Sequence, residues 1–281
     1  MNFISGCCLF FLITSTLHAQ VYKNQEGALE KHFVYEVKQV DEFFERFNDD
    51  PHSFIRQIYK SYDRKFNISR TQLVESLFNY ETKSWNDKIT DEFIASVTNT
   101  QKPLKLNFYD DDWFAEAVCR FQYNSSEIEI PIILRIVTDQ NKGSKWVIAG
   151  VKPNAIKEDL TPIPDNSFNS TVFIQPASHS NNFIALEKAL SDHDNLRAYF
   201  DKNFFLGRNS LTFYNAIFNH NARILFVKNI RYHFLQIQNY VFSVEHFERD
   251  TKNSGWLINS LQQISEAEKI KYINNLLGQP N

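Results

Sequence analysis

Three charged side chains near the middle of the chain could line one surface. Glu116 and Arg120 lie four residues apart in a segment of alternating apolar and polar residues, so a strand places them on one face. Arg135, in the next such segment, can point the same way. A carboxylate beside two guanidinium groups could bind a polar ligand, or could belong to a solvated, ion-paired sheet surface. These three residues are the candidate ligand-binding residues.

Metal-ligating residue types are present, but without the spacing of a known site. His233 and His246 would share one face of a hairpin if Gln238-Asn239 formed a two-residue loop, and a register shift of one residue would separate them. No third ligand accompanies them. Asp110 to Asp112 lack the alternating donors and the glycine of a calcium loop, and they favour a turn. The sequence predicts no metal site and no cofactor.

The residues of other familiar catalytic sites are also missing. Cys119 is the single cysteine after removal of an export signal, and its position on the apolar side of a strand predicts a buried core thiol. The 7 glycines are too scattered to build a phosphate-binding loop. A net charge of −3 argues against nucleic acids and anionic membranes as partners. No catalytic residue is predicted.

Residues 1–19 have the properties of a signal peptide. Residues 3–17 are mostly apolar and uncharged, and Leu17-His18-Ala19 predicts cleavage before Gln20. The apolar run is too short to span a membrane comfortably. Cys7 sits in a sequence like a lipoprotein cleavage box, but this box precedes the apolar run and therefore does not favour lipidation. We expect an exported bacterial protein, periplasmic or extracellular, with no membrane span after cleavage.

The candidate residues lie within a predicted strand meander, Leu104 to Val151. Alternation of period two identifies four segments, and turn residues such as Asn124-Ser125-Ser126 join them, which predicts an antiparallel four-stranded sheet. Pro131 cannot donate a ladder hydrogen bond and predicts an edge position or a bulge. Amphipathic helices precede the meander: Val40, Phe43, Phe44 and Phe47 form an apolar stripe, and Ser69 with Gln72 predicts a capping box. The first half is therefore predicted to be α+β.

This order of elements resembles a known superfamily. The helix Val40-Asp41-Glu42-Phe43-Phe44-Glu45-Arg46-Phe47-Asn48 and the strand Lys145-Trp146-Val147-Ile148-Ala149-Gly150-Val151 are similar to those of nuclear transport factor 2-like proteins, over residues 35–155. The resemblance implies a cone of helices on a curved sheet, and within the superfamily it points to exported bacterial proteins of unknown function. Enzymes of the superfamily, such as ketosteroid isomerase, place a carboxylate and a tyrosine in the cone. No motif here assigns those roles to particular residues.

The rest of the chain predicts a linker and a second, smaller α+β domain. Residues 156–180 have the composition of a linker, and residues 181–281 restart the pattern with a helix, several strands and a terminal helix opened by Ser265 and closed by Gly278. The predicted strands are Ser210 to Phe218, Arg223 to Val227, Ile230 to Ile237, Tyr240 to Phe247 and Trp256 to Leu261. Because Trp256 matches Trp146 at the end of a meander, the second domain could be a reduced copy of the first, without its covering helices.

The function that follows is an exported, non-catalytic binding or interaction protein of the cell envelope. Its partner would be a small molecule bound in the cone or another envelope protein. The alternatives are an enzyme with acid-base residues in the cone and a structural component of an envelope assembly. A buried carboxylate or histidine directed into a cavity would favour the enzyme. The oligomeric state is not indicated by the sequence.

Overall fold

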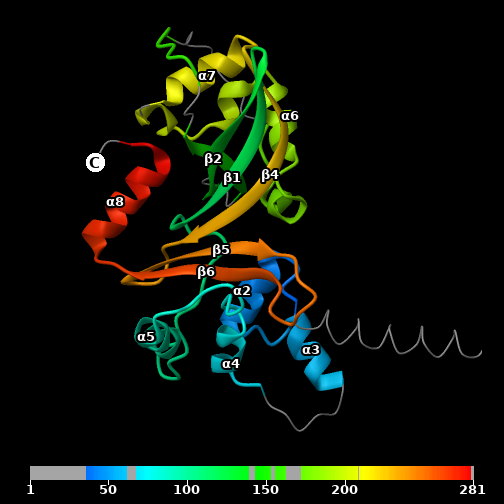
Figure 1. Ribbon diagram of the computed structural model, residues 1–281, viewed down its shortest axis with the longest axis vertical. Coiled ribbons are helices and arrows are strands. Elements are labelled where there is room, and N and C mark those ends of the chain that lie inside the picture. The colour runs from blue at the N-terminus through cyan, green and yellow to red at the C-terminus, as the bar shows by residue number, and fades with distance from the viewer. Residues whose placement is uncertain are drawn as a thin grey trace, which may run out of the picture.

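The computed structural model describes residues 36–61, 68–138, 143–152, 156–162, 172–207 and 209–279. The predicted signal peptide and part of the predicted linker lie outside these residues. The described residues form an α+β fold around a six-stranded antiparallel sheet with the strand order β3-β2-β1-β4-β5-β6 (Figure 1). The predicted α+β class is confirmed at this level.

Two three-stranded meanders make up the sheet. The strands are β1 (Trp113–Tyr123), β2 (Ser126–Thr138), β3 (Ser144–Val151), β4 (Ala222–Phe234), β5 (Tyr240–Phe247) and β6 (Gly255–Gln263). The segment from Leu104 to Phe108, predicted as a first strand, is not one. The side chain of Asn48 takes both backbone groups of Leu106, donating to its O and accepting from its N at 2.8 Å each, so these groups are not available to a strand.

The two meanders are continuous with one another. β1 and β4 pair antiparallel along their whole length, from Trp113↔Phe234 to Tyr123↔Ala222. The prediction of a second module with its own sheet therefore differs from the structure, in which both meanders share one sheet. Strand pairing between residues so far apart in the chain has no local sequence signal.

One predicted strand is a helix. Residues Ser210 to Phe218 form α7. Seven of its nine residues are buried, and they occupy all faces of the helix. Such burial removes the polar face that identifies an amphipathic helix, and the aromatic residues of the segment favour a strand by propensity alone. Tertiary packing decided this element.

The helices lie mostly on one side of the sheet. Before β1 come α2 (Val40–Asn48), α3 (Phe54–Ser61), α4 (Arg70–Glu75) and α5 (Asp87–Val97). Between β3 and β4 come η1 (Pro176–Asn181), α6 (Ala185–Ser191), η2 (Leu196–Tyr199), η3 (Phe204–Leu206) and α7, and α8 (Glu266–Leu277) follows β6. Both predicted caps are present, the Ser69 and Gln72 capping box of α4 and the left-handed Gly278 after α8.

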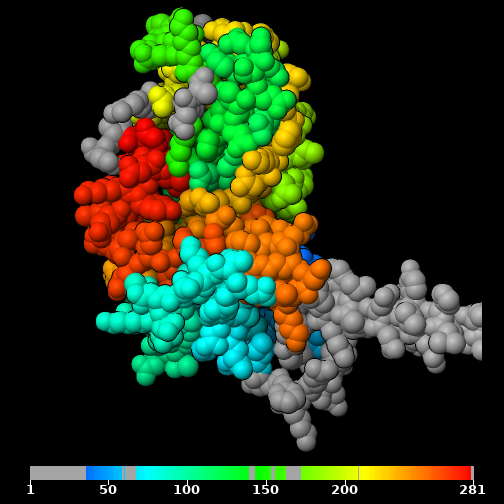
Figure 2. All heavy atoms as spheres, viewed as in Figure 1, coloured from blue at the N-terminus to red at the C-terminus, as the bar shows by residue number. Residues whose placement is uncertain are grey.

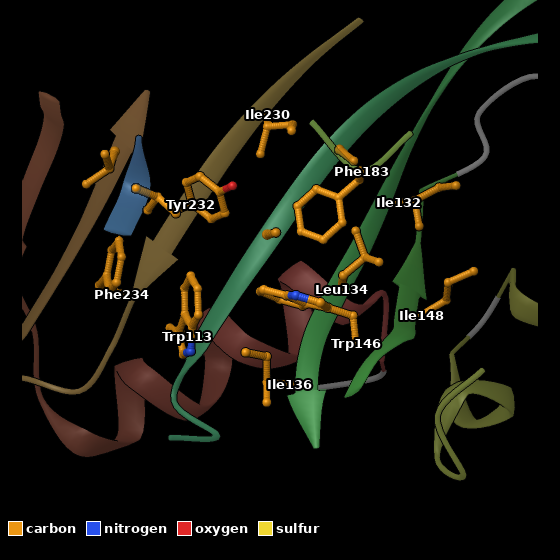
Figure 3. Packing of buried hydrophobic residues seen from close by; sticks show 14 of the residues in the cluster. Trp113, Ile132, Leu134, Ile136, Trp146, Ile148, Phe183, Ile230, Tyr232 and Phe234 are labelled. Carbon is orange, nitrogen blue, oxygen red and sulfur yellow. The ribbon is translucent and has the colours of Figure 1, made fainter. Parts of the chain in front are cut away.

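The main core fills the space between these helices and the sheet. Trp113 and Trp146 meet edge to face with ring centroids 5.2 Å apart, and Phe183 packs against Trp146 (Figure 3). Trp146 is fully buried and Trp256 is 6% exposed. Cys119 also lies in this core, as predicted.

The two meanders share their registers. A bulge falls just before the pair Leu134↔Ile148 in the first and just before Val244↔Ile258 in the second. Leu134 pairs with Ala115 of β1, and Val244 pairs with Tyr232 of β4. Ala115 and Tyr232 are themselves partners across β1 and β4. A local two-fold relation therefore runs through the Ala115–Tyr232 pair and makes the strands of one meander equivalent to those of the other.

Several helices, in contrast, cover the meander of the other half of the chain. α2 and α5, from the start of the chain, contact β6 (Figure 1). η1, η2 and η3 contact β3, α7 contacts both β3 and β4, and α6 contacts β4. Single bridges follow the same pattern: Phe78 pairs with Ile258 on β6, and Phe200 pairs with the equivalent Ile148 on β3. The second meander, predicted to lack covering helices, is covered at β6 by α2 and α5 and at β4 by α6 and α7.

Candidate functional site

The structure does not bring the three predicted ligand-binding residues into one pocket. Glu116, Arg120 and Arg135 share the face of the sheet opposite the main core, but Arg120 lies about 13 Å along β1 from Glu116. Arg120 is paired with the exposed Glu129, with Nη2 2.7 Å from Oε1. Arg135 is paired with Asp201, with Nη2 2.7 Å from Oδ2. Each of the two arginines therefore has its own carboxylate.

Glu116 belongs instead to a buried network under α8. His233 Nε2 lies 3.0 Å from Glu116 Oε2, and His233 Nδ1 lies 2.7 Å from the hydroxyl of Tyr272 on α8. Lys152 Nζ lies 3.4 Å from the other oxygen of Glu116. Figure 2 shows α8, in red, on the surface beside β5 and β6, in orange. Among the described helices, α8 alone covers this side, with Leu276 packed against Phe114 and Ile133.

Electrostatics determine which atoms carry protons in this network. Burial opposes the charge of Glu116, but the hydrogen bond from His233 and the charge of Lys152 lower the pKa of Glu116 to about 2. Burial lowers the pKa of His233, against the influence of Glu116. Burial and the charge of Glu116 raise the pKa of Tyr272 to about 12. His233 is therefore neutral, donates from Nε2 to the ionised Glu116 and accepts from the Tyr272 hydroxyl at Nδ1.

His233 and His246 do not share a face of the hairpin. The register is His233↔Ser243, one residue away from that of a two-residue Gln238-Asn239 loop, and residues 235–239 join the strands, with Asn239 at a φ of 64°. This one-residue change from a two-residue loop turns His246 to the core face, while His233 faces α8. Within the described residues, no group of three or more His, Cys, Asp or Glu could hold a metal ion.

A cavity of 380 Å³ lies where β4 diverges from β5. The two strands pair only from Arg231↔Glu245 to Phe234↔Phe242, although β4 begins at Ala222. The gap is closed by the start of α2, by η1 and by the beginning of β6. The described lining residues are Lys38, Gln39, Val40, His179, Ser180, Asn182, Val227, Lys228, Asn229, Ile230, Glu245, His246 and Trp256.

Substitutions at equivalent positions explain why the cavity is open. The two-fold relation places Ile230 where the first meander has Trp113, and His246 and Trp256 where it has Ile136 and Trp146. In the first meander the two tryptophans fill this space (Figure 3). The side chain of Ile230 is much smaller than that of Trp113, and the volume it leaves is part of the cavity.

Sequence reasoning missed the polar wall of this cavity. His179 and Ser180 fall in the predicted linker, but η1 holds them against α2. His179 Nδ1 lies 2.7 Å from the O of Pro176, and Nε2 lies 3.0 Å from both carboxylate oxygens of Asp41 on α2. The Ser180 hydroxyl lies 3.3 Å from the same Nε2. No local pattern in the sequence indicates these contacts, because Asp41 and His179 belong to distant segments.

Comparison with protein-family models, curated proteins and solved structures found no match to the chain. The resemblance to nuclear transport factor 2-like proteins stays a prediction. No described helix is long and apolar enough to cross a membrane.

Proposed function

We propose that the protein is a non-catalytic binding protein, exported into the bacterial envelope, that holds a small polar molecule in the cavity between β4, β5, α2 and η1. The observation that carries the proposal is this cavity of 380 Å³, within the size range of small-molecule sites. It is lined by an aromatic ring, Trp256, and by several hydrogen-bonding side chains. In the first meander, Trp113 and Trp146 fill the equivalent space. That the second meander leaves this space open supports a role in binding.

The lining favours an uncharged ligand with several hydroxyl or amide groups. Ser180, Asn182, Asn229 and His246 offer both donors and acceptors. The two lysines at the rim have other partners: Lys228 Nζ lies 2.8 Å from Glu129, and Lys38 Nζ lies 6.0 Å from the centroid of the Phe54 ring. Both positive charges therefore have partners within the protein, so the lining does not favour an anionic ligand.

The protonation states described above support binding over catalysis. A reactive residue has a pKa tuned towards its task, for example a thiol or phenol whose pKa is lowered. Burial raises the pKa of the Cys119 thiol, and the pKa of Tyr272 is raised to about 12. Both groups are thereby held in their neutral, unreactive forms. Glu116 and His233 are tied to each other and to α8 and not directed into the cavity.

A cavity-filling substitution tests the proposal. Ile230→Trp introduces at this position the side chain that the first meander carries at Trp113, and it should abolish binding while the fold is kept. The matched control Ile230→Val keeps the cavity open. A panel of sugars, polyols, nucleosides and amides is screened by melting temperature, and each hit is measured by calorimetry. A ligand at 100 times its dissociation constant stabilises the wild-type protein by about 2.7 kcal/mol. Hits that bind Ile230→Trp and Ile230→Val equally well would exclude this cavity.

A further inference from the structure

A second cavity lies in the first half of the molecule, outside the proposed binding cavity. It is a cleft of 530 Å³ between the ends of β2 and β3 and the segment from η2 to Lys202. Its described lining residues are Asp111, Arg135, Val137, Thr138, Lys145, Val147, Arg197, Ala198, Phe200, Asp201 and Lys202. We refer to it as the basic cleft.

The charge of the basic cleft is opposite to that of the whole chain. Four of its described lining residues are cationic, Arg135, Lys145, Arg197 and Lys202, against the two carboxylates of Asp111 and Asp201. The chain as a whole has a net charge of −3. A local excess of positive charge in a concave site attracts anions, because the low-dielectric walls focus the field.

The carboxylate of Asp201 orients one of the two arginines of the basic cleft. Asp201 is 5% exposed, and its Oδ2 accepts from Arg135 Nε at 3.0 Å and from Nη2 at 2.7 Å. Its Oδ1 accepts from the backbone N of Asn203 at 2.7 Å, and its own N donates to the O of Ile148 on β3. Asp201 therefore fixes the guanidinium plane of Arg135 and uses two of its five donors.

Arg197 is oriented by a different contact. Its guanidinium carbon lies 4.4 Å from the centroid of the Phe205 ring, and its Nη1 lies 3.4 Å from the O of Asp201. Partial burial leaves this cation incompletely solvated and therefore lowers the pKa of Arg197. An anion placed beside Arg197 would replace that missing solvation. Phosphate oxygens accept hydrogen bonds from planar guanidinium groups and from lysine ammonium groups. The basic cleft offers two of each.

We propose that the basic cleft is an anion-binding site that takes the phosphate group of a phosphorylated small molecule. Arg135 and Arg197 provide planar, fixed donors, and Lys145 and Lys202 neutralise the remaining charge. The cleft volume leaves room for an organic group beyond the phosphate. The site is separate from the proposed cavity for an uncharged ligand, and each can be tested without the other.

Calorimetric titration tests this proposal with inorganic phosphate, glycerol phosphate and vesicles containing anionic phospholipid. Saturable binding of glycerol phosphate that weakens as ionic strength rises is expected. Phosphate should bind more weakly, and vesicles should not bind. The variant Lys145→Gln with Lys202→Gln keeps the Arg135–Asp201 pair and should weaken binding at least tenfold, since two charge-assisted contacts to the phosphate are lost. The control Lys88→Gln removes an exposed lysine of α5 and should bind as wild type.

Three results would overturn the proposal. The first is no saturable binding of phosphate or glycerol phosphate at millimolar concentration in low salt. The second is equal affinity in the double variant and the Lys88→Gln control. The third is binding to vesicles alone, which would assign the cleft to a membrane surface.

Discussion

The two meanders of the sheet share one backbone plan and differ in what their side chains enclose. Both have the same strand pairing and the same bulge, before Leu134↔Ile148 and before Val244↔Ile258. In the first, Trp113 and Trp146 fill the space below the helices. In the second, Ile230 and His246 leave a cavity beside Trp256. A shared frame can therefore be packed solid or opened for a ligand by changing few residues, because register sets where side chains point and their sizes set what remains empty.

The exchange of helices qualifies this comparison. α2 and α5, which precede the first meander, contact β6 of the second, and η1, η2 and η3, which follow β3, contact β3 of the first, so each half buries part of the apolar face of the other. Shared registers and bulges are what a duplicated unit would produce, and the duplication itself stays a prediction. If each half depends on the other for its cover, the halves should unfold together.

The largest expected effect comes from the two equivalent tryptophans. Trp146→Ala should cost about 3–5 kcal/mol, because a fully buried ring and the hydrogen bond from its Nε1 to Pro176 O are lost. Trp256→Ala should cost less, since Trp256 already borders a cavity. Urea denaturation followed by circular dichroism should show a single transition in both variants. Two separate transitions would contradict the dependence of each half on the other.

A second prediction concerns two equivalent positions beside the two-fold, Glu116 and His233. The pKa of Glu116 is lowered from 4.5 to about 2 in the folded state, so its stabilisation is present above pH 4.5 and is lost as pH falls towards 2. The pKa of His233 is also lowered from 6.5, so the unfolded chain takes up this proton more readily and the loss begins below pH 6.5. The lowered pKa of Glu116 alone should remove roughly 3 kcal/mol on acidification, and the lowered pKa of His233 adds to this loss.

Denaturation at a series of pH values measures this loss. Glu116→Gln should be less stable than wild type at neutral pH and should lose less stability between pH 4.5 and 2. The control Glu129→Gln, which removes an exposed carboxylate paired with Arg120, should keep the wild-type acid dependence closely. An acid dependence in Glu116→Gln as steep as in wild type would assign the loss to other groups.

The smallest expected effect tests the asymmetry of the outer face. The equivalent positions Gly150 and Ser260 differ because a Cβ on Gly150 would lie 2.8 Å from the Leu277 Cα of α8. Gly150→Ala must displace this helix and should cost about 1–3 kcal/mol. Ser260→Ala loses a hydroxyl contact of 2.6 Å with Ser243 and should cost about 1 kcal/mol. Equal melting temperatures of the two variants would show that α8 is not packed tightly on the sheet.

Much of the fold could be predicted from local patterns. The stripe of α2, the caps of α4 and α8, the alternation of β1 to β3 and the burial of Cys119 depend on neighbouring residues and on the preference of apolar groups to leave water. Ser210–Phe218 and Leu104–Phe108 could not be predicted in this way. In the first, burial on all sides removed the helical pattern. In the second, Asn48 from a distant helix took the backbone hydrogen bonds of Leu106.

The sequence by itself determined the α+β class and most helix and strand positions, because these depend on contacts close in the chain. It also placed Glu116 on the sheet face opposite the apolar side of its strand, from the alternation alone. Only the tertiary structure decided that β1 pairs with β4, that α2 and α5 cover β6, and that Glu116 meets His233 and Tyr272. It also decided that Arg135 turns to Asp201 and that His179 reaches Asp41. Each of these contacts joins segments far apart in sequence, and the closure of the long loops between them leaves no periodic trace in the residues themselves.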